Sequence, residues 1–128
     1  MASIEPTETQ MAALLSAAAE SDAPVVMVNL LQFGPGGDKS YHRYAEEVKP
    51  FLESVGATVL YAGDASHVVV GDIDKPWWDA ILVVRYPSRA AFLAMAGNSD
   101  YHEKANAHRV AALESTHLIA TDPWKVSR

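Results

Sequence analysis

Two segments of strand length are dominated by apolar residues: residues 25–33 (VVMVNLLQF) and residues 79–86 (DAILVVRY). Runs of this kind are typical of strands buried on both faces, because a strand with one face in solvent alternates polar and apolar positions. We therefore expect both segments to lie in the centre of a sheet. Residues 58–71 and 113–121 predict two further strands, the first of them bulged or broken at Gly63.

Apolar residues at helical spacing predict the helices. Between residues 40 and 55 they form one stripe on a helix face: Tyr41, Tyr44, Val48, Phe51, Leu52 and Val55. Near the N-terminus, Thr7 and Gln10 have the spacing of a capping box, and apolar residues follow at helical intervals. Ser88 is a suitable N-cap for a later helix, and one more helix is predicted over residues 101–109.

The predicted elements follow the order α, then β-α-β-β-α(α)-β. The last six match the split βαβ pattern of a ferredoxin-like α+β fold, whose antiparallel sheet has the strand order 4-1-3-2. This order places the two most apolar strands in the centre. The order of the elements and the apolar composition of the strands therefore support the same fold independently. We expect an N-terminal helical extension over residues 1–23 and a single ferredoxin-like domain over residues 24–128.

The helices of such a fold cover one face of the sheet and leave the other open. Several side chains on the open face must be apolar here, because the central strands are apolar on both sides. An exposed apolar surface of that size is an association surface. Two sheets packed face to face would cover it, so we expect a symmetric homodimer.

The charge of the chain narrows the class of partner. The formal net charge is -6, and the isoelectric point is near 5.2. Nucleic acids and anionic membranes attract clusters of Lys and Arg, so neither is an expected partner. There are no cysteines, which excludes disulfides and thiolate chemistry. Neither a signal peptide nor an apolar run of membrane-spanning length is evident, so the cytoplasm is the expected location.

Several stretches resemble a known family. They are PVVMVNLLQF, then YHRYAEEVKP, then WWDAILVVRYPSRAAFLAM, then Asp100-Tyr101, and together they span residues 24–121. The most specific part is Trp78-Asp79 followed by RYPSR at 85–89. The chain resembles a bacterial family of small uncharacterised proteins in the dimeric α/β-barrel superfamily. That superfamily includes cofactor-free monooxygenases, muconolactone isomerases and haem-binding chlorite dismutases, so the resemblance implies the fold without naming a reaction.

Asn29 and His117 are the first candidates for catalytic residues. Asn29 is a polar residue within an apolar strand, and His117 is near the middle of the last strand. In the expected sheet these strands are antiparallel neighbours, so the two side chains can form a cross-strand or diagonal pair. A neutral histidine held by an amide can accept a proton near pH 7. The alternative is a satisfied core amide and a solvated histidine.

Four further residues are candidates for substrate binding. Arg85 can bind a carboxylate or pair with an acidic residue across a dimer, and it lies at the opposite end of its strand from Asp79. Trp78, together with its neighbour Trp77, can cover a pocket or fill a dimer contact. Asp79 can cap or form a salt bridge, or act as a buried base. Tyr41 can reach a cavity between helix and sheet, or simply pack in the core.

No cofactor or metal is predicted. The loop at residues 34–40 follows a strand and precedes a helix, but Asp38 stands where a phosphate-binding loop needs glycine. The five histidines form no HExxH or HxH motif: His42, His67, His102, His108 and His117. A protein-bound zinc site is therefore not expected. Haem on a single histidine rests on the superfamily resemblance alone.

These observations leave two hypotheses for function. In the first, a homodimer binds a small apolar or aromatic carbonyl compound between helices and sheet and acts as a cofactor-independent isomerase or monooxygenase. His117 and Asn29 would then supply the base and the oxyanion donor, while Arg85 or Tyr41 would orient the substrate. In the second, the protein is a non-enzymatic dimeric binding or stress-associated module, and the same polar residues only satisfy the core.

Overall fold

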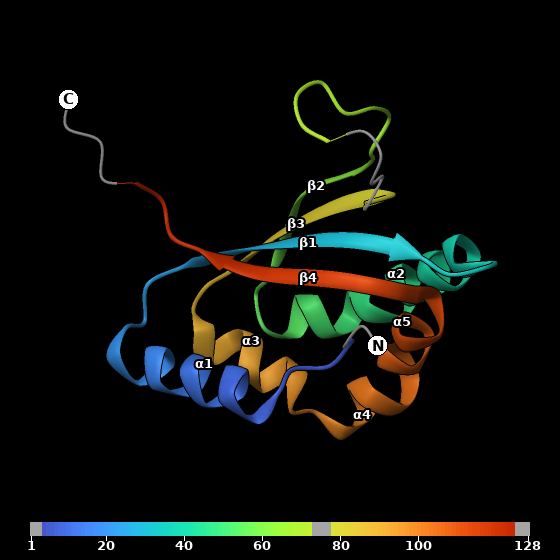
Figure 1. Ribbon diagram of the computed structural model, residues 1–128. Helices are drawn as coiled ribbons and strands as arrows, with labels where there is room; N and C mark the ends of the chain where they lie inside the picture. Colours follow the sequence, from blue (N-terminus) through green and yellow to red (C-terminus); the bar gives the residue numbers. More distant parts are fainter. Residues whose placement is uncertain (1–3, 73–77, 125–128) are drawn as a thin grey trace.

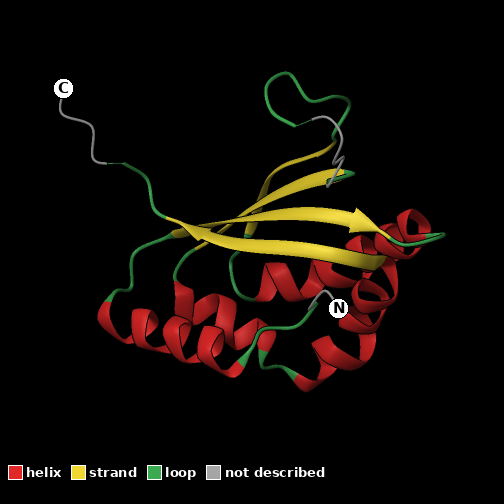
Figure 2. Cartoon of the chain, viewed as in Figure 1, coloured by secondary structure: helices red, strands yellow, loops and turns green. Residues whose placement is uncertain are grey.

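The computed structural model describes residues 4–72 and 78–124 and contains one antiparallel sheet with its helices on one side (Figures 1 and 2). The strands are β1 (Val25–Phe33), β2 (Thr58–Asp64), β3 (Ala80–Tyr86) and β4 (Leu113–Thr121). The helices are α1 (Glu8–Glu20), α2 (Gly37–Ser54), α3 (Arg89–Ala96), α4 (Ser99–Tyr101), the π-helix η1 (His102–Asn106) and α5 (Ala107–Ala112). Trp77 and most of the predicted loop before it lie outside the described residues.

The strand order β2-β3-β1-β4 is the order predicted from the apolar pattern. β1 pairs antiparallel with β3 on one side and with β4 on the other, so the two most apolar strands are central. This confirms the α+β, ferredoxin-like arrangement. Among the described helices, none is long and apolar enough to cross a membrane.

The core lies between the sheet and the helices. From β1, Val25, Met27 and Leu31 point to the helix side and are buried, because alternate residues of a strand share a face. The apolar stripe predicted for α2 supplies the opposing surface with Tyr41, Tyr44, Val48 and Leu52. α1 begins with the expected capping box and lies beside α3, but none of its residues is buried (Figure 1). One side of α1 therefore remains available to line a cavity.

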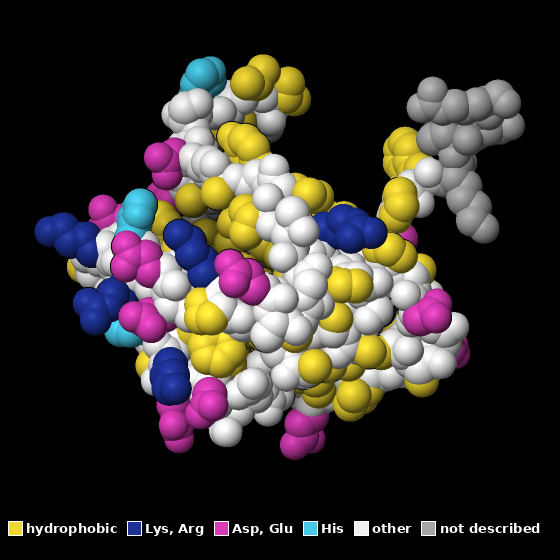
Figure 3. All heavy atoms as spheres, turned by 180° about the vertical axis from the view of Figure 1, so that it is seen from behind, with side chains coloured by type: hydrophobic (Ala, Val, Ile, Leu, Met, Phe, Trp, Pro, Cys, Tyr) yellow, Lys and Arg dark blue, Asp and Glu magenta, His cyan; other side chains and the backbone are white. Residues whose placement is uncertain are grey.

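No described helix covers the other face of the sheet (Figure 2), and the strands direct apolar side chains to it. The strand register places Val26, Val28 and Leu30 of β1 there, beside Ile81, Val83 and Ile119. On the edge strand β2, Tyr61 is opposite Val83 on this face, and its side chain is exposed. Seen from behind, hydrophobic side chains gather below the loop at residues 65–72 (Figure 3).

Two predicted boundaries differ in the structure. The extended stretch predicted over residues 58–71 breaks at Gly63-Asp64 as expected, and what forms is a strand that ends at Asp64 and not at residue 71; Asp64 is paired with Ala80, the first residue of β3. Beyond that point no described strand continues the pairing, and residues 65–72 project as an exposed loop. The helix expected to begin near residue 40 begins at Gly37, where a Cβ would clash with the Ala112 carbonyl. Glycine permits this close contact between the start of α2 and the end of α5.

Candidate functional site

A cavity of about 770 Å³ lies between the helix side of the sheet and the N-terminal segment with α1. Its floor comes from β1 and β4, one wall from α3, and its far end from the helices that follow Asn98. This volume lies within the range of about 300–1,000 Å³ that is usual for small-molecule sites. A cavity between helices and sheet is also where the sequence interpretation expects a small molecule to bind.

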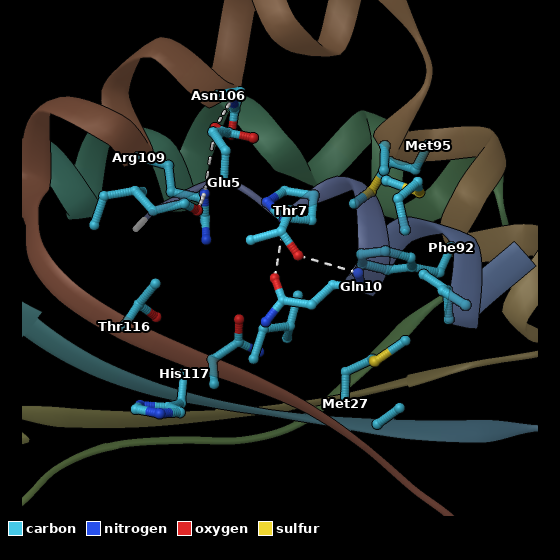
Figure 4. Close-up of a pocket in the computed structure, with 18 of the residues that line it drawn as sticks. Glu5, Thr7, Gln10, Met27, Phe92, Met95, Asn106, Arg109, Thr116 and His117 are labelled. Atoms are coloured by element: carbon cyan, nitrogen blue, oxygen red, sulfur yellow. Dashed lines mark hydrogen bonds and ion pairs between the residues drawn. The ribbon is translucent and has the colours of Figure 1, made fainter. Parts of the chain in front are cut away.

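Most of the cavity wall is apolar and adaptable. Met27 reaches in from β1, and Phe92 and Met95 from α3 (Figure 4). Met11 and Leu14 line it from α1. Unbranched methionine side chains adjust to ligands of different shape, so these walls suit an apolar body without strict steric selection.

The far end of the cavity is polar. There the side chains of Glu5, Asn106 and Arg109 come together (Figure 4). Glu5 precedes α1, whereas Asn106 is the last residue of η1 and Arg109 belongs to α5. The Asn106 amide nitrogen donates to Glu5 Oε1 at 2.9 Å, and Arg109 Nη1 lies 3.7 Å from the same oxygen. Arg109 Nη1 also donates to the Ile4 carbonyl at 3.1 Å. These contacts hold the N-terminal segment over the cavity.

Two tyrosines extend this polar cluster into the core. The hydroxyls of Tyr44 and Tyr101 are hydrogen-bonded at 3.0 Å, and Tyr101 donates to Asn106 Oδ1 at 3.4 Å. Burial raises the pKa of Tyr44 well above its usual value and also raises the pKa of Tyr101. Both phenols therefore stay protonated at neutral pH and act as hydrogen-bonding groups.

The π-helix η1 explains how Tyr101 and Asn106 meet. In a regular α-helix, residues five apart are separated by about 140° around the axis and cannot share a face. A π-turn accommodates one additional residue and brings positions i and i+5 together. The regular helix predicted over residues 101–109 was therefore wrong in its interior. Segments of this type occur frequently at functional sites.

His102 closes the cluster on its outer side. Its Nε2 contacts the Ala96 carbonyl oxygen and its Nδ1 contacts the Asn106 amide nitrogen. Because the carbonyl can only accept, the proton is on Nε2 and Nδ1 is the acceptor. Both ring nitrogens thus serve to fix Asn106 and the end of α3.

The predicted pairing of Asn29 with His117 is not formed. Asn29 is opposite Leu118 in the β1–β4 register and points to the helix side, where it lines the cavity and donates to the Leu82 carbonyl at 3.1 Å. His117 is the next residue along β4, so its side chain points to the opposite face. Figure 4 shows its ring turned away from Glu5 and Arg109. The base and the amide proposed from sequence are therefore separated by the sheet.

The other predicted site residues are dispersed. Trp78 packs edge-on against the His117 ring, with centroids 5.1 Å apart, on the open face. Arg85 lies opposite Val26 on that same face and is exposed, far along β3 from Asp79 as expected. Asp79 is exposed rather than buried, and its carboxylate accepts from the Phe33 amide at 2.8 Å. It serves as a cap at the strand end.

Tyr41 is buried beside the rings of Phe33 and Tyr44 and packs in the core. Burial raises its pKa, so it also carries a neutral phenol. Of the six predicted residues, Asn29 and His117 both border the cavity, and Asn29 is the one whose side chain the strand register directs into it. Within residues 4–72 and 78–124, no group of three His, Cys, Asp or Glu side chains is placed to hold a metal ion.

The sequence interpretation missed the polar end of the cavity. The candidate site residues predicted from the sequence include neither Glu5 and Asn106 nor Tyr101 and Arg109. The one available signal was Arg109 itself, a charged residue in a helix whose other residues include Ala105, Ala111 and Ala112. Its partner on the N-terminal segment is more than a hundred positions away, and no local pattern links them.

Several solved structures have a similar fold. A protein of unknown function from Rhodopseudomonas palustris is 30% identical, with a TM-score of 0.85, and the match covers 98% of this chain and 100% of that one. A dimeric ferredoxin-like protein of unknown function from Jannaschia sp. CCS1 is 10% identical over 79% of this chain and 100% of that one, with a TM-score of 0.59.

A cofactor-independent oxygenase from Streptomyces nogalater has a TM-score of 0.53 at 13% identity, over 83% of this chain and 97% of that one. At such low identity, this likeness and that to the Jannaschia protein show a common fold alone. No protein of curated function matches the chain. The model of a family described as a domain of unknown function (DUF1330) matches residues 35–122. That match spans more than half of the sequence, and the chain therefore belongs to the DUF1330 family.

Proposed function

We propose that this protein binds a small, largely apolar carbonyl compound in the cavity beneath α1. The observation that carries the proposal is a cavity of about 770 Å³ with methionine and phenylalanine walls and hydrogen-bond donors at one end. Apolar walls with a few convergent polar groups are typical of ligand sites. The guanidinium of Arg109 and the Asn106 N–H that bonds to Glu5 are donors, and a carbonyl oxygen that takes the place of the Glu5 carboxylate is an acceptor that fits them.

Binding without turnover is the better supported of the two hypotheses. A proton-transfer enzyme needs a base that reaches the substrate. In the described part of the cavity, His102 uses both ring nitrogens in contacts with Ala96 and Asn106. The tyrosines have raised pKa values, which makes them poor bases at neutral pH. His117 points to the other face of the sheet, and the Glu5 carboxylate, which lines the cavity, is engaged by Asn106 and Arg109.

Cofactor-independent isomerase or oxygenase chemistry is the second candidate. It is favoured by the hydrogen-bonded series from Tyr44 through Tyr101 to Asn106, whose members all line the cavity. Neutral phenols and amides in a buried site can stabilise an oxyanion that develops on a substrate carbonyl. This role would replace the one first assigned to Asn29 and His117.

We also propose that the functional unit is a homodimer joined through the open faces of two sheets. Six apolar side chains lie on that face: Val26, Val28, Leu30, Ile81, Val83 and Ile119. Burial of such a face supplies the main driving force for association. The relative from Jannaschia is itself described as dimeric. Trp78, His117 and Arg85 would lie at or near this interface, as contacts between subunits.

The cavity proposal is tested by titration with Nile red, a neutral apolar dye whose fluorescence rises in dry surroundings. We expect saturable binding with one dye per chain. Ala13→Trp places an indole in the cavity mouth and should weaken binding about tenfold or more. Ala12→Trp is the matched control, because Ala12 is also exposed on α1 but does not line the cavity.

Comparison of the two tryptophan variants shows whether the dye binds in the cavity or elsewhere, for example on the open face of the sheet. Equal effects of both variants, or no effect of Ala13→Trp, would place the dye elsewhere and overturn the proposal. The absence of saturable binding by the wild-type protein would overturn it as well. Native mass spectrometry of the purified protein, with a co-purifying small molecule of constant mass, would give independent support.

A further inference from the structure

Arg109 is a nearly buried cation at the polar end of the cavity. Its side chain is 11% exposed, and it lies among Tyr41, Tyr44 and Tyr101, which are neutral. A charge in such a place needs a counter-charge, because burial of an unpaired ion is costly. Among the described acidic residues, Glu5 is the one within ion-pair distance. The cavity therefore has one cationic end, at Arg109, and the carboxylate that pairs with it comes from the same chain.

The Glu5 carboxylate occupies this end with imperfect geometry. It lies 3.7 Å from Arg109 Nη1, which is longer than a hydrogen bond, and receives a direct bond from Asn106 at 2.9 Å. Its side chain is half exposed, at 51%, on a short segment ahead of α1. Exposed partners contribute little to ion pairs. A carboxylate that approached through the cavity could instead form the two parallel bonds that a guanidinium favours.

We infer that the natural ligand carries a carboxylate, which displaces Glu5 and binds to Arg109 and Asn106 while its apolar body fills the cavity. The inference rests on the proposed function and adds the chemical class: a small monocarboxylic acid with an aliphatic or aromatic body. The exchange leaves Arg109 paired throughout, since one carboxylate replaces another. Glu5 thus acts as an internal competitor for the site.

Displacement of Glu5 also affects the N-terminal segment. Arg109 holds this segment through the Ile4 carbonyl as well as through Glu5, and Asn106 contributes the third contact. A ligand carboxylate that engages Asn106 and Arg109 replaces the Glu5 carboxylate as the partner of both. The segment then keeps the contact between the Ile4 carbonyl and Arg109 and loses those of Glu5 with Asn106 and Arg109, which loosens its hold over the cavity.

The inference is tested by competition against bound Nile red. Octanoate and hydrocinnamate are each compared with their primary amides, which have the same shape and no charge. We expect each acid to bind about tenfold more tightly than its amide, because charge-assisted bonds are about twice as strong as neutral ones. The two pairs show whether the body is aliphatic or aromatic. Glu5→Gln should tighten the binding of the acids several-fold and leave the amides unchanged.

Two arginine variants show whether Arg109 causes the preference for acids over amides. Arg109→Met should abolish the preference for acid over amide, whereas Arg43→Met, at an exposed arginine paired with Glu47 on α2, should preserve it. Equal binding of acids and amides by the wild type would overturn the inference and leave the cavity proposal intact. Weaker binding of the acids by Glu5→Gln would overturn the displacement of Glu5. Failure of Nile red itself to bind would instead overturn the proposed function.

Discussion

Asn29 and His117 lie on hydrogen-bonded neighbouring strands and face opposite sides of the sheet. Asn29 is opposite Leu118 and points towards the helices, whereas His117 is opposite Leu30 and packs against Trp78 on the open face. One position along β4 decides between these faces, because strand side chains alternate with a period of two.

This relationship predicts which substitutions affect the cavity. Asn29→Asp places a carboxylate in the cavity wall and should weaken octanoate binding by charge repulsion, by about tenfold. His117→Gln changes only the open face and should leave octanoate and Nile red affinities unchanged within about twofold. Both are measured by the Nile red competition assay. A loss in His117→Gln as large as that in Asn29→Asp would contradict this assignment of faces.

The hydroxyl of Tyr101 should contribute measurably to stability. It is bonded to the Tyr44 hydroxyl at 3.0 Å and donates to Asn106 Oδ1, and both partners are buried. Tyr101→Phe leaves these groups without that partner and should lower the free energy of unfolding by about 1–3 kcal/mol. Urea denaturation at pH 7 measures the change. Tyr61→Phe removes a hydroxyl from a tyrosine that is 59% exposed, so an equal loss there would contradict the prediction.

Stability should fall at alkaline pH. Burial raises the pKa values of Tyr41, Tyr44, Tyr86 and Tyr101 in the folded state, while an unfolded tyrosine loses its proton near pH 10. Above that pH the unfolded chain binds fewer protons than the folded one, so the free energy of unfolding decreases as pH rises. Well below pH 10 tyrosines keep their protons in both states, so these groups contribute no slope there.

Urea midpoints at pH 9, 10 and 11 test this dependence. Tyr44→Phe removes one of the buried phenols and should make the alkaline decline shallower. Tyr61→Phe, at the exposed position, serves as the control. A decline that is equally steep in wild type and Tyr44→Phe would show that other groups cause it.

The homodimer is tested at a single position on the open face. Ile119 lies there on β4 and is 43% exposed in the single chain. Ile119→Asp should convert the dimer to a monomer at micromolar concentration, because a buried unpaired carboxylate opposes association. Sedimentation equilibrium measures the mass. Leu15→Asp, at an exposed apolar residue of α1, should leave the dimer intact, and a wild-type monomer under the same conditions would overturn the proposal.

The local pattern of residues was sufficient to predict the strand order. The apolar runs at residues 25–33 and 79–86 indicated central strands, and β1 and β3 are central. The capping box at Thr7 and Gln10 also forms as expected. These features depend on residues that are close in sequence, or on burial that affects a whole segment, so they leave a signal in the sequence itself.

Only the tertiary structure decided which polar groups meet. Glu5 and Asn106 are 101 positions apart and Tyr44 and Tyr101 are 57 apart, and no periodicity connects such pairs. The π-turn that brings Asn106 beside Tyr101 depends on how the chain packs between α4 and α5. The sequence by itself thus determined the sheet and its apolar faces, whereas the cavity and its cationic end arise from contacts formed when distant segments pack together.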